Sequence, residues 1–269
     1  MSLLGETSVL YRARNFTGAD GDVWPNEGTA GSAYDAIAFP ISGSTLALPH
    51  YVTTPSPGFE ITAANLAYYY VADGTAIEPG TGSFTVFAKF YWPSGAGSLD
   101  NVFSKINIDG GAIGSGGKGW QIISGSALGG TTLGVIAGGG SAFGTDPVAA
   151  SSGSVISSGE HLVALRVDRA GTDVVDMFID GTIAASHVGS AATVTDVTAV
   201  HELIFGRGTT QTLRDYGLWA RALTNTEITV TLPYELAATF GTVTSTTARV
   251  GSATATSTLV GTLTATVGV

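Results

Sequence analysis

The segment from Gly159 to Ser186 constrains the fold of this chain more than any other. It contains two runs in which apolar and polar residues alternate, His161–Val167 and Val174–Ile179, and a third run begins at Thr182. Asp180-Gly181 stands between the second and third runs. Asp-Gly in such a place is the strongest short-range signal for a two-residue hairpin, because both central residues of a type I′ turn need positive φ. The sequence therefore predicts antiparallel strands here.

Similar alternation occurs along most of the chain, so we expect many short strands. Ser83–Trp92 is the clearest, because every second residue in Phe84–Phe90 is apolar. Further strands are predicted at Ile37–Phe39, Thr45–Leu48, Leu66–Val71, Asn101–Ile108, Gly119–Ser124, Thr131–Ala137, Glu202–Gly206 and Leu213–Trp219. Residues 1–35 are predicted to be irregular, and residues 138–158 to form a surface connection. Many short strands with almost no helix indicate a sandwich or a barrel.

One helix is predicted after these strands. Thr224-Asn-Thr-Glu227 matches a capping box, in which the threonine hydroxyl accepts a hydrogen bond from an amide and the glutamate reaches back to another. The helical segment that follows, Ile228–Leu236, contains Pro233. Because proline cannot continue a regular helix, we expect one or two turns.

From residue 241 the composition changes to a repeat of glycine, threonine and valine with a period of ten. An even period keeps equivalent residues on the same side of an extended chain, so one side is mildly apolar and the other carries hydroxyl groups. A single ribbon of this kind cannot bury its apolar side unaided. The residues that we assign to assembly on this basis are Gly241, Val243, Gly251, Ala253, Gly261 and Leu263.

Composition and charge argue against several classes of function. The 269-residue chain has a formal net charge of −10, which disfavours non-specific binding to nucleic acid or to an anionic membrane. It has no cysteine, so disulfides and thiolate metal sites are excluded. No run approaches the roughly 18 consecutive apolar residues of a membrane-spanning helix. The N-terminal sequence lacks the features of a secretory signal peptide. We expect no nucleic-acid partner and no membrane insertion.

The strands of residues 83–227 resemble, in order and spacing, those of a concanavalin A-like, laminin G-type jelly roll, a domain found in lectins, glucanases and many phage proteins. The matching segments are Phe84-Thr-Val-Phe-Ala-Lys-Phe90, Val102-Phe-Ser-Lys-Ile106, Gly119-Trp-Gln-Ile-Ile123, Glu160–Asp168, Met177-Phe-Ile-Asp-Gly-Thr182, Leu203-Ile-Phe-Gly-Arg207 and Asp215–Ile228. The resemblance implies an all-β fold, a two-sheet antiparallel jelly-roll sandwich with one short helix and a C-terminal β-repeat tail. The tail itself resembles repeats at the ends of phage virion proteins.

Two regions are therefore expected. Residues 1–236 would form a laminin G-like jelly roll with an irregular N-terminal segment, and residues 237–269 would form the assembly tail. The tail would join the chain into a homo-oligomer, with a trimer as the simplest closed arrangement, or attach it to another virion protein. The alternative is a disordered low-complexity segment.

No catalytic constellation stands out. Glucanases of this fold place carboxylates as Glu-x-Asp-x-(x)-Glu on one strand, and none of the eight glutamates of this chain lies in that pattern. His161 and His201 each neighbour a glutamate, but adjacent strand residues point to opposite faces, so we expect strand-edge residues rather than ligands. The segment Gly111–Gly119 is out of register for a phosphate-binding loop. We predict that the chain is not an enzyme.

Two sets of side chains remain as candidates for binding. The aromatic rings that could stack on a sugar are Trp92, Trp120, Tyr216 and Trp219, although alternation places some of them in the core. The carboxylates that could hold a calcium ion around one hairpin are Asp168, Asp173 and Asp176. The alternative is that these aspartates are solvated turn residues. No other cofactor is expected.

These observations predict a non-enzymatic phage virion protein, a tail, fibre or capsid-surface component. It would be made in the host cytoplasm and would display its jelly roll on the particle for contact with a host surface or its glycans. The alternative is a stand-alone carbohydrate-binding, lectin-like module of a secreted or surface protein.

Overall fold

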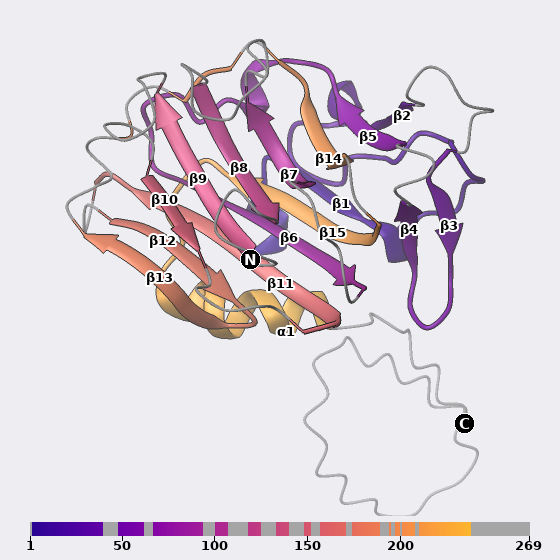
Figure 1. Cartoon of the computed structure of the whole chain (residues 1–269). Coiled ribbons are helices and arrows are strands. Elements are labelled where there is room, and N and C mark those ends of the chain that lie inside the picture. Colours follow the sequence, from indigo (N-terminus) through magenta and orange to yellow (C-terminus); the bar gives the residue numbers. More distant parts are fainter. Residues whose placement is uncertain are drawn as a thin grey trace, which may run out of the picture.

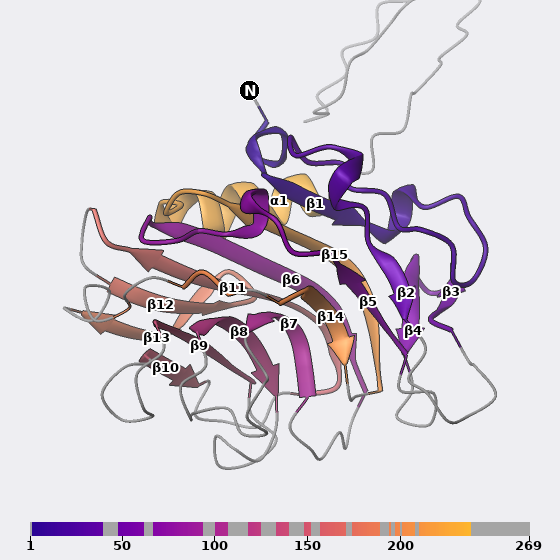
Figure 2. The same ribbon diagram turned by 90° about the horizontal axis from the view of Figure 1, so that it is seen from above.

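The computed structural model describes residues 2–39, 48–61, 67–93, 100–106, 118–124, 133–139, 148–151, 157–170, 174–188, 194, 197–199, 201–207 and 210–237. Its strands form two antiparallel sheets that stack face to face (Figures 1 and 2). Sheet I consists of β1 (Val9–Arg12), β3 (His50–Val52), β4 (Gly58–Ile61), β6 (Phe84–Trp92), β11 (Gly159–Asp168), β12 (Val174–Ile179), β13 (Thr182–Val188) and β15 (Gln211–Trp219). Sheet II consists of β2 (Ile37–Phe39), β5 (Tyr68–Val71), β7 (Asp100–Ile106), β8 (Lys118–Ser124), β9 (Leu133–Gly139), β10 (Val148–Ser151) and β14 (Leu203–Arg207).

The order of strands confirms the predicted all-β sandwich. Sheet I runs β13-β12-β11-β6-β15-β4-β3, with β1 paired to β15 beside β4, and sheet II runs β10-β9-β8-β7-β14-β5-β2. The hairpin predicted at Asp180-Gly181 is also confirmed. Asp180 has a φ of 50° and Gly181 a φ of 76°, as a type I′ turn between β12 and β13 requires.

Four strands differ from the prediction. β1 lies in the segment expected to be irregular, β10 lies in the expected surface connection, and β3 and β4 were not anticipated. Each has only three or four residues, too few for alternation to be recognised in the sequence. The predicted strand Thr45–Leu48 falls almost entirely outside the described residues.

The main core lies between the sheets and is rich in aromatic rings. Trp24, from the N-terminal segment, is 1% exposed. Its ring centroid lies 4.7 Å from that of Phe59, 5.5 Å from that of Tyr69 and 6.0 Å from that of Tyr216. These rings come from β4, β5 and β15, so Trp24 packs between strands of both sheets. The N-terminal segment is therefore part of the sandwich and not an appendage.

The helix is longer than predicted. The capping box is confirmed: the Thr224 amide donates to Glu227 Oε2 at 2.7 Å, and the Glu227 amide donates to Thr224 Oγ1 at 3.2 Å. The chain stays helical from residue 225 to residue 237, through a π-helical turn, Glu227–Thr231, into α1 (Leu232–Ala237). The Leu232 amide donates to the Glu227 carbonyl five residues back, and this wider turn accommodates Pro233 where a regular helix would be broken.

The helix packs on the outer face of sheet I, together with the N-terminal residues (Figure 2). Glu235 accepts hydrogen bonds from the amides of Leu3 and Leu4, both at 2.8 Å. Arg14 Nη1 donates to the Leu236 carbonyl at 2.6 Å, which satisfies one of the free carbonyls at the helix end. The first residues and the last described residues therefore hold each other in place across the sheet. None of the described helices is long and apolar enough to cross a membrane.

One lysine is completely enclosed. Lys105 is 0% exposed, and its Nζ lies 2.6–2.7 Å from oxygen atoms of Asp73, Glu78, Ala199 and His201. The ammonium group thus joins the loop between β5 and β6 to the segment that leads into β14. A buried cation needs such a set of partners, because an unpaired one would be costly to desolvate.

Candidate functional site

The outer face of sheet I is divided into two halves of opposite character. The covered half lies under the helix and the N-terminal residues, and it presents Leu10, Phe87, Ala164, Phe178 and Trp219. The open half lies beyond the end of the helix toward β3 and β4, and it presents mostly polar side chains. A solvated face of an antiparallel sheet carries polar side chains, and those of the open half are therefore available to a ligand.

Cross-strand pairing sets the side chains of the open half in two rows, since directly opposed residues share a face. The first row crosses β3, β4, β15, β6 and β11, and it contains His50, Glu60, Thr212, Tyr91 and Glu160. The second row crosses β1, β15, β6 and β11, and it contains Arg12, Asp215, Lys89 and Leu162.

A β-bulge adds Arg214 to this surface. The register of β15 against β6 shifts between Leu213 and Asp215, which leaves Arg214 as the extra residue. Bulges commonly re-aim a side chain in this way. Arg214 is 5% exposed, donates from Nη1 to the Ser56 carbonyl and places Nε 3.6 Å from Glu160 Oε2. Burial lowers the pKa of Arg214, and the charge of Glu160 opposes that shift.

Glu160 joins the two rows. Its Oε1 lies 2.8 Å from Lys89 Nζ, while its Oε2 faces Arg214. The carboxylate side chain is 40% exposed and that of Lys89 is 23% exposed. The cluster therefore remains accessible to a ligand from the solvent side.

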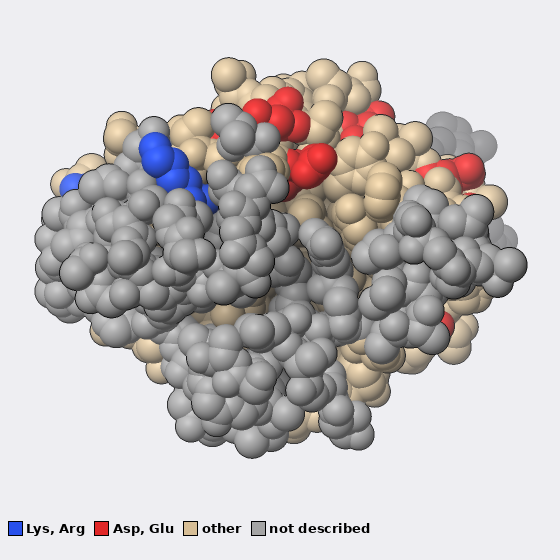
Figure 3. Space-filling view, turned by 45° about the horizontal axis from the view of Figure 1, so that its top comes forward, with Lys and Arg blue, Asp and Glu red and all other residues tan. Residues whose placement is uncertain are grey.

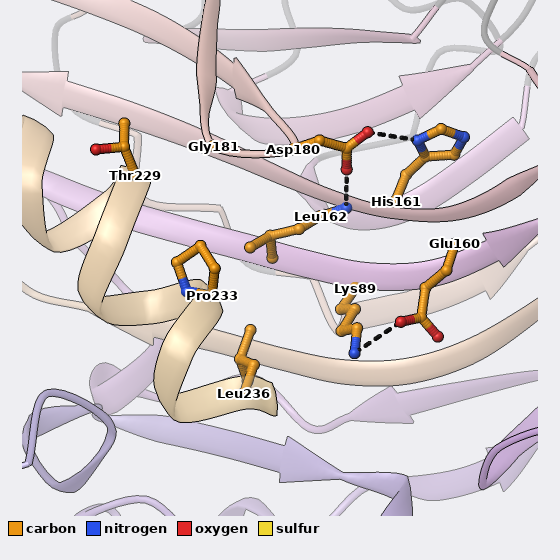
Figure 4. Close-up of a pocket in the computed structure, with 9 residues that line it drawn as sticks. All are labelled: Lys89, Glu160, His161, Leu162, Asp180, Gly181, Thr229, Pro233 and Leu236. Carbon is orange, nitrogen blue, oxygen red and sulfur yellow. Dashed lines mark hydrogen bonds and ion pairs between the residues drawn. The ribbon is translucent and has the colours of Figure 1, made fainter. Parts of the chain in front are cut away.

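A hollow of about 310 Å³ lies between the end of the helix and the turn from β12 to β13 (Figure 4). Its lining residues are Lys89, Glu160, His161, Leu162, Asp180, Gly181, Thr229, Pro233 and Leu236. The π-helical turn supplies Thr229, whose carbonyl would lie 3.2 Å from a Cβ at Gly181. Glycine at this position thus allows the helix to approach closely and allows the turn to adopt a positive φ.

At the edge of this hollow, His161 is held from both sides. Its Nδ1 lies 2.8 Å from Asp180 Oδ2, and its Nε2 lies 2.9 Å from the Ser157 carbonyl. A carboxylate and a carbonyl can only accept hydrogen bonds, so both contacts are satisfied together only by the imidazolium form. The hydrogen bond to Asp180 accordingly raises the pKa of His161, although burial opposes the shift. The remaining Asp180 oxygen accepts from the Leu162 amide at 2.9 Å.

Two smaller hollows flank Tyr91. One, of about 210 Å³, is lined by Val52, Thr54, Pro55, Glu60, Tyr91, Thr212 and Arg214. The other, of about 180 Å³, is lined by Glu60, Ile61, Tyr91, Pro93, Thr210, Gln211 and Thr212. Tyr91 is 37% exposed, so its ring stands between them with solvent access.

Glu60 and Glu160 are not spaced for glycoside hydrolysis. Glu60 and Glu160 lie three strand spacings apart in the first row, about 14 Å, whereas such enzymes hold their carboxyl groups roughly 5–9.5 Å apart. Burial raises the pKa of Asp215 to about 6, but this residue is only 4% exposed. The carboxyl group of Asp215 therefore lies beneath the surface, out of reach of a ligand.

The predicted sugar-stacking residues lie elsewhere. Trp92 is 4% exposed, Trp219 is 1% exposed, and Trp120 and Tyr216 are 0% exposed. Trp92, Trp120 and Tyr216 belong to the core between the sheets, whereas Trp219 packs under the helix against Phe87. The prediction is corrected here: large rings fill the two cores, and none of the four presents a face to a sugar.

The predicted calcium ligands are also not free to form a site together. Asp176 is 1% exposed and accepts a hydrogen bond from Arg166 Nε at 2.9 Å. Asp168 accepts from the Ala170 amide at 3.1 Å, and Asp173 lies outside the described residues. Within the described ranges, no group of three or more histidine or acidic residues could hold a metal ion. Calcium at this hairpin would have to displace the Arg166 guanidinium.

Several other predictions can be placed. His161, expected at a strand edge, pairs with Phe90 of β6 and is 8% exposed. The His201 carbonyl accepts a hydrogen bond from Lys105 Nζ. The assembly residues Gly241, Val243, Gly251, Ala253, Gly261 and Leu263 lie outside the described residues.

The comparisons with known proteins identify the fold. No protein-family model and no curated protein sequence matches the chain. Among solved structures, the receptor-binding domain of botulinum neurotoxin D is similar over 86% of this chain and 53% of that one, with a TM-score of 0.56 and 10% identity. The binding domain of Paraclostridial Mosquitocidal Protein 1 is similar over 85% and 52%, with a TM-score of 0.59 and 12% identity.

A third similar structure is the botulinum neurotoxin serotype D ligand-binding domain in complex with N-acetylneuraminic acid, with a TM-score of 0.56 and 12% identity over 86% of this chain and 50% of that one. The chain thus spans about half the length of these domains. At such identities the likeness shows a shared jelly-roll-like sandwich and nothing about ligands.

Proposed function

We propose that this chain is a non-enzymatic glycan-binding module and that the open half of sheet I is its binding surface. The observation that carries the proposal is the exposed ring of Tyr91 beside the carboxylate of Glu60 and the hydroxyl of Thr212. An aromatic face packs against the apolar face of a sugar ring, and the neighbouring polar groups take its hydroxyls.

The similar structures support the proposal by analogy. One of them is described as a complex with N-acetylneuraminic acid, and a further similar structure, the binding domain of botulinum neurotoxin DC, is described as a complex with SialylT, so sugar ligands are associated with proteins that contain this sandwich. Those domains are about twice as long as the matched region. The analogy therefore favours glycan binding but does not indicate which residues of this chain would bind the sugar.

The arrangement of charges supports binding over catalysis. Glu160 is engaged by Lys89 and Arg214, and Glu60 and Glu160, both in the first row, are too far apart to act as acid and nucleophile. The described residues therefore offer fixed hydrogen-bonding groups without a matched acid and base.

A glycan array probed with the whole chain tests the proposal. We expect Tyr91→Ala to weaken binding of the recognised glycan by tenfold or more, which corresponds to about 1.4 kcal/mol. Tyr234→Ala is the matched control, because Tyr234 is an exposed tyrosine on the helix, outside the open half. Absence of binding to every glycan, or equal losses in both variants, would contradict the proposal.

The ten-residue repeat supports a second role, assembly into a virion. We propose that residues 241–269 join copies of the chain or attach it to a particle protein, with the sandwich displayed on the particle surface. Deleting these residues leaves α1 intact and should yield a monomer by light scattering that still binds glycan. An unchanged oligomeric state after the deletion would remove the support for assembly.

A further inference from the structure

We infer that the sugar bound at Tyr91 is neutral, with vicinal hydroxyl groups that donate to Glu60, and that acidic sugars are excluded. The inference rests on the proposed function and names its ligand class. Its starting point is Glu60, an exposed carboxylate that lines both hollows beside Tyr91. None of the ion pairs among the described residues includes Glu60, although its charge acts on His50, opposite it on β3, and on Arg214.

The cations around the open half already lie against acidic or carbonyl oxygens, although Arg214 Nε, 3.6 Å from Glu160 Oε2, makes no hydrogen bond. Arg214 donates to the Ser56 carbonyl and faces Glu160. The remaining pairs in this region are Lys89 with Glu160 at 2.8 Å, His50 with Asp20 at 2.6 Å, and Arg12 with Glu27. An acidic sugar would have to displace one of these carboxylates to gain a cation of its own. Displacement would exchange one exposed ion pair for another, so the acidic sugar would gain little net affinity from the cation.

The carboxylates, by contrast, favour hydroxyl donors. Glu60 has two oxygens that only accept hydrogen bonds, and two adjacent hydroxyls of a sugar ring can donate one to each. A ligand carboxylate in the same place would meet like charge from Glu60, which lines both hollows. The whole chain has 21 acidic and 11 basic residues and a net charge of −10, and patches of Asp and Glu are visible on the face of the molecule drawn in Figure 3.

The shape of the surface limits the ligand to one or two rings. The hollows of about 210 Å³ and 180 Å³ share Glu60, Tyr91 and Thr212, so they adjoin each other at one aromatic residue. Each is smaller than the roughly 300–1,000 Å³ of pockets that enclose a drug-sized ligand. A sugar at the end of a glycan chain fits this description, with the rest of the chain in solvent.

The experiment is a glycan array that carries both neutral and acidic terminal sugars, followed by calorimetry of the whole chain with the best ligand of each class. We expect neutral sugars to bind at least tenfold more tightly than acidic ones, with little dependence on salt because no charge is matched. Glu60→Gln should weaken the neutral ligand tenfold or more and improve any residual binding of the acidic one.

Glu202→Gln is the matched control, since it removes another exposed carboxylate, next to sheet II and away from the open half. Thermal melts establish that each variant folds before its affinity is compared. Tighter, salt-sensitive binding of acidic sugars would overturn the inference and leave glycan binding intact. Binding of no sugar at all would refute the proposed function itself, so the two failures can be told apart. Equal affinity in the Glu60→Gln and wild-type proteins would also refute the role of Glu60.

Discussion

The two halves of the outer face of sheet I are made from the same strands but do different things. On β6, Phe87 packs under the helix and is 0% exposed, whereas Lys89, two residues further along the same face, forms a partly exposed ion pair. On β11, Ala164 is in the covered half and Glu160 in the open half. The position of the helix end thus decides which part of one sheet face is core and which part is available for binding.

The two halves also treat charge differently. In the covered half, Arg166 and Asp176 are almost completely buried, and Arg166 Nη1 donates to the Leu223 carbonyl at 2.9 Å. In the open half, Glu160 shares two cations at the surface. A buried pair is costly to break and an exposed pair is not, so substitutions in the two halves should have very different effects on stability.

The largest contrast is expected for aromatic residues. Trp219→Ala should lower the free energy of unfolding by about 3–5 kcal/mol, because it opens a cavity under the helix and removes the hydrogen bond from Nε1 to the Leu3 carbonyl. Tyr91→Ala, in the open half, should change stability by less than about 1 kcal/mol. Urea unfolding of both variants measures the difference. Similar losses would mean that Tyr91 is a core residue and not a ligand platform.

The contrast between ion pairs should be nearly as large. Asp176→Ala leaves the buried Arg166 guanidinium without its carboxylate and should cost about 3–5 kcal/mol. Lys89→Met, which breaks the exposed pair with Glu160, should cost about 1 kcal/mol or less.

Adding calcium to the wild-type protein during the same unfolding series also tests the predicted Asp168, Asp173 and Asp176 site. A rise in stability with calcium would restore that hypothesis despite the Arg166 contact.

The sequence predicts the long strands well because alternation over six or more residues is a clear signal. β6, β11, β12 and β15 each follow it, and so does the Asp180-Gly181 turn. The open half could not be predicted in the same way. Its residues come from several strands, one of them the unexpected β4, and only the register of pairing brings Glu60 and Tyr91 together. The bulge that turns Arg214 toward Glu160 has no sequence signal of its own.

The error over the aromatic residues has a physical cause. Ring size alone does not say which face of a strand a residue occupies. Trp92 follows Phe90 and Phe84 at even spacing, so the alternation that predicted β6 also places Trp92 in the core, as the structure shows. Tyr91, one residue earlier, occupies the opposite face and is the ring that reaches solvent. Period-2 spacing was thus a better guide to which ring is exposed than the identity of the side chain.

The smallest expected effect is a pH dependence at the edge of the open half. Because the folded state raises the pKa of His161 through Asp180, the stabilisation is fully present below the unfolded value of about 6.5 and is lost as the pH rises through the folded pKa. Unfolding in urea should therefore show wild type losing stability relative to His161→Gln above pH 6.5.

The same pair has a second, opposite dependence in acid. Hydrogen bonds from His161 and the Leu162 amide lower the pKa of Asp180 despite the opposing effect of burial, so its contribution is lost only as the pH falls below its unfolded value, near 3.8. The hydrogen bond to Asp20 also raises the pKa of His50. His50→Gln is therefore the control, because it removes the exposed His50–Asp20 pair and leaves the His161–Asp180 pair intact. Parallel stability curves for wild type and His161→Gln from pH 5 to 9 would show that the imidazolium is not held as the geometry indicates. If the pH dependence of stability changes in His161→Gln and not in His50→Gln, the proton responsible is the one on His161, where the helix, the β12–β13 turn and the open half meet.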